Sequence, residues 1–150
     1  MRTVRYQEFR AAVCDSDGCW STRPLSEAGV SVDKGAGWAY FLSERHFETA
    51  RCVGRRGITK GVCDAVAVPR QYRRQIVFLE LKTSGSYPHA VDQIRACVEL
   101  LLAFDIPSNV ALTAEIWHSR EPKSQLAVGR SQIKVAGRTV LIRRKRSGSA

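Results

Sequence analysis

Apolar residues fall into short runs separated by segments rich in Gly, Pro, Ser or Arg. The runs at 62–68 and 76–83 are apolar at nearly every position, which is typical of strands inside a sheet that helices cover on both faces. Their alternation places Val66 and Phe78 on one face and Ala65 and Leu79 on the other. A third strand is predicted at 110–118, and a hairpin at 132–135 and 138–143 with Ala136-Gly137 as its turn.

Two segments have helical spacing instead. Residues 38–53 carry Trp38, Leu42 and later apolar positions on one stripe, and Gly54-Arg-Arg-Gly57 follows as a stop. Residues 88 to about 104 place Val91, Ile94, Val98 and Leu101 on a second stripe, beginning at Pro88. Residues 1–37 lack a clear period and are expected to be irregular. The order helix, strand, strand, helix, strand and hairpin predicts an α/β fold with a mixed sheet.

The length of 150 residues predicts one domain, at 1–142, followed by a disordered basic tail at 143–150. No stretch approaches the roughly 18 apolar residues of a membrane span, and the first residues lack the apolar core of a signal peptide. We therefore expect a protein without membrane contact, located in the cytoplasm, or at the nucleus or nucleoid according to the host.

Charge narrows the function more than size does. Lys and Arg number 24 against 14 Asp and Glu, which gives a net charge of +10. A domain this basic favours nucleic acid as a partner, because every neutralised phosphate releases counterions.

The five cysteines, an odd number, make a disulfide framework improbable. Cys14, Cys19, His46 and Cys52 could together supply four zinc ligands, although their spacing matches no common zinc motif. Cys52, Cys63 and Cys97 are better explained as small buried residues.

Three charged residues stand inside the two apolar strands. Glu80 and Lys82 lie two positions apart and so share a strand face, and pairing Val66 with Phe78 in a hairpin places Asp64 opposite Glu80. Directly opposed residues have Cβ atoms about 5 Å apart. Two carboxylates at that separation among valines and leucines repel each other and lose their hydration. A divalent cation between them removes the free-energy cost of both effects. The pattern predicts a metal site with a lysine beside it. The alternative is an ordinary ion pair between Glu80 and Lys82.

This arrangement resembles the PD-(D/E)-x-K nuclease superfamily, whose signature is an acidic residue on one strand and an acid-x-Lys triplet on the next. Here these positions are Asp64 and Glu80-Leu81-Lys82, and Cys63 stands where many members have proline. The resemblance covers about residues 38–118. It implies a restriction-endonuclease-like α-β-β-α-β core with a central mixed sheet flanked by helices, to which this chain adds the C-terminal hairpin.

The resemblance also implies site roles. Asp64, Glu80 and the backbone carbonyl of Leu81 would bind Mg²⁺, with Mn²⁺ as a substitute, and Lys82 would orient or deprotonate the attacking water. A glutamate on the first helix would complete the metal site, and either Glu44 or Glu48 could be that residue, with Glu44 slightly preferred. Gln93, on the helix after Lys82, is a further catalytic candidate, although a helical glutamine is more often exposed.

The basic residues that precede the first acid or lie between the two strands are candidates for phosphate contacts: Arg55, Arg56, Lys60, Arg70, Arg73 and Arg74. The run 143–146 could add a mobile phosphate clamp. The expected function is that of a Mg²⁺-dependent endonuclease with structure-selective or low sequence specificity, acting on DNA in preference to RNA. A homodimer would supply two sites for double-strand cleavage. The alternative is a non-catalytic nucleic-acid-binding module that retains the fold.

Overall fold

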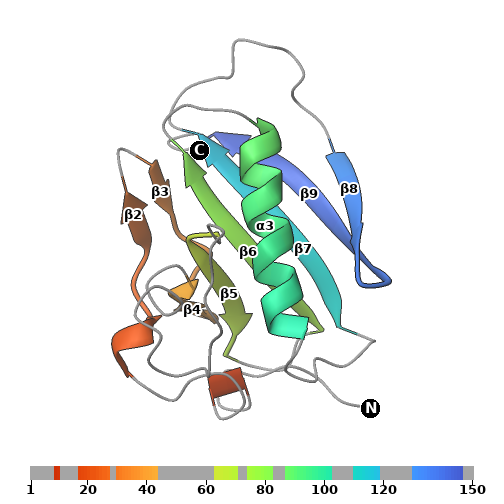
Figure 1. The fold of residues 1–150 in the computed structure, drawn as a ribbon. Helices are drawn as coiled ribbons and strands as arrows, with labels where there is room; N and C mark the ends of the chain where they lie inside the picture. The colour runs from red at the N-terminus through yellow and green to blue at the C-terminus, as the bar shows by residue number, and fades with distance from the viewer. Residues whose placement is uncertain are drawn as a thin grey trace.

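A computed structural model describes residues 9–10, 17–27, 30–43, 63–70, 74–82, 87–102, 110–118 and 130–146. It shows a mixed α/β fold built on a seven-stranded sheet with the order β1-β4-β5-β6-β7-β9-β8, and helix α3 lies across this sheet (Figure 1). The strands are β1 (Trp20–Ser21), β4 (Trp38–Phe41), β5 (Ala65–Pro69), β6 (Gln75–Lys82), β7 (Ala111–His118), β8 (Arg130–Val135) and β9 (Arg138–Arg146). A separate hairpin consists of β2 (Leu25–Glu27) and β3 (Val30–Val32), and a 3-10 turn spans Asp17–Cys19.

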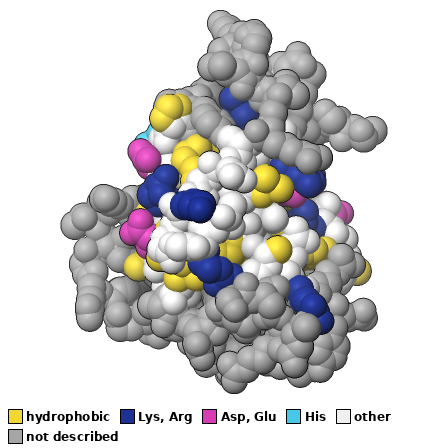
Figure 2. Space-filling model, turned by 90° about the vertical axis from the view of Figure 1, so that its right-hand side faces the viewer, with side chains coloured by type: hydrophobic (Ala, Val, Ile, Leu, Met, Phe, Trp, Pro, Cys, Tyr) yellow, Lys and Arg dark blue, Asp and Glu magenta, His cyan; other side chains and the backbone are white. Residues whose placement is uncertain are grey.

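Strand β6 joins two differently built halves of the sheet. On one side β4, β5 and β6 pair antiparallel, with Val66 opposite Phe78 as the sequence predicts. On the other side β6, β7 and β9 run parallel, and β8 closes the edge antiparallel to β9. Figure 2 presents the side of the molecule that carries this β8 edge, where Lys and Arg side chains are spread among apolar and other groups.

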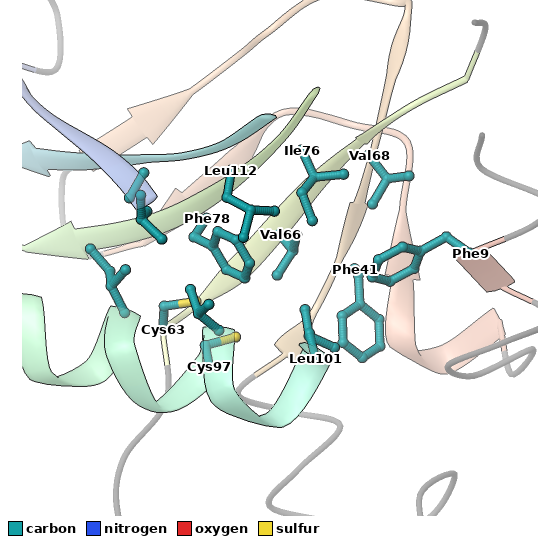
Figure 3. Close-up of a cluster of buried hydrophobic side chains, with 14 of the residues drawn as sticks. Phe9, Phe41, Cys63, Val66, Val68, Ile76, Phe78, Cys97, Leu101 and Leu112 are labelled. Carbon is teal, nitrogen blue, oxygen red and sulfur yellow. The ribbon is translucent and has the colours of Figure 1, made fainter. Parts of the chain in front are cut away.

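Helix α3 (Tyr87–Leu102) connects β6 to the parallel strand β7 and covers one face of the sheet, which we call the helix face. Its buried stripe of Ala90, Ile94, Cys97, Val98 and Leu101 belongs to the same core as Val66, Phe78 and Ile142 of the sheet. Figure 3 shows Val66, Phe78, Leu112 and Leu101 in this core, with Phe9 and Phe41 at one end of it.

The opposite face, which we call the hairpin face, holds a smaller core. Val32 from β3 packs with Trp38, Tyr40, Ala67, Val77 and Leu79. Strand β3 contacts β6 and β7, so the β2–β3 hairpin covers the middle of this face. Among the described residues a hairpin, and not the expected second helix, takes this place. Apolar residues on both faces of β5 and β6 follow from this double covering, and their division between the two faces is the predicted one.

Three predictions are wrong. The region 1–37 is not irregular throughout, because it holds β1 and the β2–β3 hairpin. Trp38–Phe41 is strand β4 rather than the start of a helix, because its four buried residues alternate between the two cores; residues 44–53 lie outside the described part. Residues 143–146 are not a disordered tail but the end of β9, paired with β7 up to His118. The basic run stays extended because Lys145 contacts both a buried carboxylate and an indole on β7.

Candidate metal site and its surroundings

The predicted acidic pair lies where β5 begins and β6 ends. Backbone pairing stops at Ala65 and Leu79, so Asp64 and Glu80 would be the next pair in the same register. Asp64 precedes β5 in a bend, and its Oδ2 accepts a hydrogen bond of 2.7 Å from the backbone N–H of Leu81. The fold therefore brings Asp64, Glu80 and Leu81 together from two segments that are separated by a hairpin loop.

Glu80 is almost fully buried, with 2% of its surface exposed. It occupies the same strand face as Ile76 and Phe78, which pack toward α3. Carboxylates at such depth are retained in proteins when they are hydrogen-bonded, paired or bound to a cation. Carboxylate and carbonyl oxygens are the hard ligands that Mg²⁺ prefers, and one or two protein carboxylates suffice when water and phosphate supply the rest. Asp64, Glu80 and the Leu81 carbonyl thus fit such an ion chemically.

A buried thiol cluster adjoins the pair. Cys63 and Cys97 are both fully buried, and Figure 3 shows their sulfur atoms close together where α3 meets the start of β5. Burial raises the pKa of the Cys63 thiol well above its ordinary value, and the neighbouring Cys97 and the Glu80 carboxylate raise it further, against a smaller lowering by Ser43. Cys63 therefore stays a protonated thiol, and its Sγ lies 3.6 Å from the carbonyl oxygen of Ala65 as a donor.

Ser43 ties this cluster to the chain after β4. Its hydroxyl donates a hydrogen bond of 2.8 Å to the carbonyl oxygen of Cys63, and both residues are completely buried. The backbone immediately before Asp64 is therefore held by a contact from another segment.

The structure places the remaining site candidates unequally. Lys82 is the last residue of β6, in register with His118 of β7, and its side chain lies outside the description. Gln93 is half-buried on α3, with its Oε1 buried and without a hydrogen-bond partner among the described residues. Glu44 and Glu48 fall outside the described ranges.

Of the six predicted phosphate-binding residues, the two that the structure describes lie away from the acidic pair. Arg70 and Arg74 are exposed in the connection between β5 and β6, at the opposite end of β6 from Glu80. Glu80 lies six positions after Arg74 along the extended strand, a distance of about 20 Å. The other four, Arg55, Arg56, Lys60 and Arg73, lie outside the described residues.

A second charged cluster, on the hairpin face, was not predicted. Glu115 of β7 is 6% exposed and pairs with Lys34 at 3.0 Å and with Lys145 at 3.4 Å. The indole N–H of Trp117 donates a further hydrogen bond of 3.1 Å to its Oε1. Burial favours the neutral acid, but the charges of Lys34 and Lys145 and the hydrogen bonds from Lys34 and Trp117 outweigh it and hold the pKa of Glu115 below its ordinary value.

The signal for this cluster was present in the sequence. Glu115 interrupts the apolar strand 110–118 just as Glu80 interrupts 76–83, but nothing local identifies Lys34 as its partner, since the two are 81 positions apart. His118 is also buried, at the end of β7 on the helix face, and its sequence context did not predict this.

For the zinc hypothesis, Cys19 is buried, whereas Cys14, His46 and Cys52 lie outside the described ranges. Over the part of the chain that can be described, no group of three or more His, Cys, Asp or Glu side chains is arranged to hold a metal ion. No described helix is both long and apolar enough to cross a membrane.

Comparison with protein-family models, curated proteins and solved structures finds no significant match.

Proposed function

We propose that this chain is a metal-dependent nuclease that hydrolyses phosphodiester bonds, with Asp64 and Glu80 as its metal-binding carboxylates. The observation that carries the proposal is the hydrogen bond from Leu81 N–H to Asp64 Oδ2, which gathers both acids and the Leu81 peptide at one end of the β5–β6 pair. The three antiparallel strands β4, β5 and β6, followed by α3 and the parallel strand β7, also support a restriction-endonuclease-like core.

Each residue has a distinct part in this proposal. Asp64, Glu80 and the Leu81 carbonyl hold Mg²⁺ or Mn²⁺, which supplies Lewis acidity toward the phosphate and lowers the pKa of bound water. Lys82 orients or deprotonates the attacking water and offsets the negative charge that develops on the phosphate. Gln93 brings an amide to the same face of the sheet from α3 and acts as a positioning residue.

The test is cleavage of supercoiled plasmid, branched DNA and single-stranded RNA with Mg²⁺, with Mn²⁺ and with chelator. We expect metal-dependent cleavage of DNA by the wild type and its loss in Lys82→Ala, Asp64→Asn and Glu80→Gln. Glu99→Gln, which removes an exposed helix carboxylate, is the matched control and should cleave normally. Absence of cleavage by the wild type, or full activity of Lys82→Ala, would contradict the proposal.

Metal binding can be followed without activity. Isothermal titration with Mn²⁺ should give a signal for the wild type and for Glu99→Gln, and a much weaker one for Asp64→Asn. Asn retains an oxygen that can accept the Leu81 hydrogen bond, so this substitution removes charge with little change of shape.

The second candidate is a non-catalytic nucleic-acid-binding module with the same fold. The observation that favours it is that Asp64 has a structural role without a metal: it accepts the hydrogen bond from the Leu81 N–H where the strand pairing ends. This alternative predicts nucleic-acid binding that is insensitive to Asp64→Asn and independent of metal, with no cleavage.

A further inference from the structure

The hairpin face is covered over only part of its area. Val32 and the β2–β3 hairpin pack over β4, β5 and β6 and also contact β7, whereas β8 and β9 present exposed side chains on this face. Strand alternation and register place Thr113 and Trp117 of β7, Leu141 and Arg143 of β9, and Gln132 of β8 there. Arg143, Gln132 and Thr139 are exposed, and Leu141, Thr113 and Trp117 are half-buried. Among the described residues, β8 and β9 therefore present a polar sheet surface here.

Three cations lie in this open area, and we call them the basic strip: Lys134 on β8 and Arg143 and Lys145 on β9. Lys134 and Arg143 are exposed, and Lys145 is 36% exposed at its side chain. Arg143 and Lys145 lie two residues apart on one strand, so they are on the same face and their backbone positions are about 6.6 Å apart. Arg143 is adjacent in register to Glu115, and Lys145 to Trp117.

The carboxylate of Glu115 does not neutralise this surface. It is shared between Lys34 and Lys145, so two ammonium groups meet one carboxylate and a positive charge remains in excess. Two indole rings also orient these lysines. The Nζ of Lys34 lies 5.4 Å from the centre of the Trp38 ring, and that of Lys145 lies 5.3 Å from the centre of the Trp117 ring. Glu115 is thus a positioning residue that holds Lys145 at the edge of the strip.

We infer that the basic strip binds the phosphate backbone of a nucleic acid. Charge complementarity identifies the occupant: exposed cations along one sheet face, with the half-buried Trp117 beside Lys145, suit a polyanion that also carries aromatic bases. A second copy of this chain is disfavoured, since each copy carries a net charge of +10. The inference rests on the proposed function, because it assigns the surface that holds the substrate of the nuclease.

Lys145, at one end of the strip, and the acidic pair lie on opposite faces of the sheet but toward the same end of it, whereas Lys134 is paired with Thr139 toward the other end. Lys145 is in register with Trp117 on β7, and Trp117 with Leu81 on β6, the residue after Glu80. A strand of nucleic acid held by the strip therefore leaves the sheet at the end where the proposed metal ligands are.

Binding is tested apart from cleavage. Fluorescence anisotropy with labelled 20-nucleotide single-stranded and duplex DNA is measured in EDTA, across a salt series, for the wild type and for Lys134→Gln/Arg143→Gln/Lys145→Gln. Each lost phosphate contact reduces the salt slope by about 0.7 for single strands and about 0.9 for duplex. We expect the triple variant to lose at least about tenfold in affinity and about two units of slope. Wild-type binding by this variant would overturn the inference.

Matched variants keep the result specific. Arg23→Gln removes one charge from an exposed site outside the strip and should bind with a clearly smaller loss than Arg143→Gln; an equal loss in these two single variants would overturn the inference. The double variant Lys134→Gln/Arg143→Gln, which leaves the Lys145–Glu115 pair intact, should lose an intermediate amount and guards against misfolding of the triple variant.

Other anionic partners are also outcomes of the test. Loss of binding to poly-glutamate or to phosphatidylserine vesicles in the triple variant, with DNA binding retained, would assign the strip to a different partner and refute the inference. Failure of the proposed nuclease activity is distinguishable: plasmid cleavage with Mg²⁺ would be absent in the wild type while strip-dependent DNA binding in EDTA remained.

Discussion

The backbone N–H of Leu81 donates a hydrogen bond of 2.7 Å to Oδ2 of Asp64, just where backbone pairing between β5 and β6 ends. The carboxylate takes the place of the backbone acceptor that a further residue pair would supply. One contact therefore terminates the strand pair and sets the position of an acid beside the Leu81 peptide. Structure and proposed chemistry depend on the same side chain, and substitution can separate them.

Replacing Asp64 with Ala removes the acceptor of the Leu81 N–H, and we expect the free energy of unfolding to fall by about 1–3 kcal/mol. Asp64→Asn keeps an acceptor oxygen and should lose less than about 1 kcal/mol, although both variants lose metal-dependent cleavage. Urea denaturation at neutral pH compares them. Equal losses of stability in the two variants would show that the hydrogen bond contributes little.

The Glu115 cluster predicts a specific loss of stability in acid. The pKa of Glu115 lies below its ordinary value of 4.5, because the lysine charges outweigh the effect of burial. The ionised form is thus favoured by folding, so its stabilisation is complete above pH 4.5 and is lost as the pH falls through the lower folded-state pKa. Between about pH 5 and pH 3, wild type should lose stability more steeply than Glu115→Gln, as measured by urea denaturation at each pH.

At neutral pH the same variant should be less stable than wild type by about 1–2 kcal/mol, since Lys34 and Lys145 lose their carboxylate partner but keep partial access to water. Glu99→Gln, which changes an exposed carboxylate of α3, controls for the loss of one negative charge. If the pH profiles of Glu115→Gln and wild type run parallel, the ion pairs do not stabilise the fold.

The turn between β8 and β9 predicts a stabilising substitution. Ala136 and Gly137 both have positive φ, of 49° and 82°, as a two-residue hairpin of type I′ requires. Alanine adopts this conformation at a cost, whereas asparagine tolerates it, so Ala136→Asn should raise the free energy of unfolding by about 0.5–1 kcal/mol. Thermal denaturation measures the change. Asn at the exposed strand position Ala111 is the control, and an equal gain there would point away from the turn.

The Cys63 thiol should be inert in the folded protein. Burial, Cys97 and Glu80 all raise its pKa, and only the thiolate reacts with iodoacetamide. We expect peptide mass spectrometry after labelling at pH 8 to find Cys63 unmodified in native protein and modified in urea. Labelling of the native protein at the rate of a free thiol would contradict the buried cluster.

The centre of the fold was predictable from the sequence because β5 and β6 carry two constraints at once. Their apolar residues must face two cores, and the acids Asp64 and Glu80 coincide in the same register that pairs Val66 with Phe78. A strand shifted by one residue would turn every side chain to the other face, so the register is strongly specified. The β8–β9 hairpin was also predictable, because Ala136-Gly137 marks its turn.

Tertiary contacts decided what local pattern could not. Trp38 and Leu42 are spaced like residues on a helix, but Trp38–Phe41 is a strand because β5 offers pairing and both cores accept its aromatic rings. The basic run after Ile142 extends β9 because Glu115 and Trp117 bind Lys145 from a neighbouring strand. Neither partner is near these segments in the sequence.

The position of β6 between an antiparallel and a parallel half has a consequence for the order of folding. Its pairing with β5 joins residues close together in the chain, whereas its pairing with β7 must wait for α3 to form and for the chain to return. Since closing a short loop costs less entropy than closing a long one, we expect the β5–β6 hairpin to form early and the β7–β9 pairing late. Asp64, Leu81 and Glu80 would then be assembled in the transition state, before the surface proposed to hold nucleic acid exists.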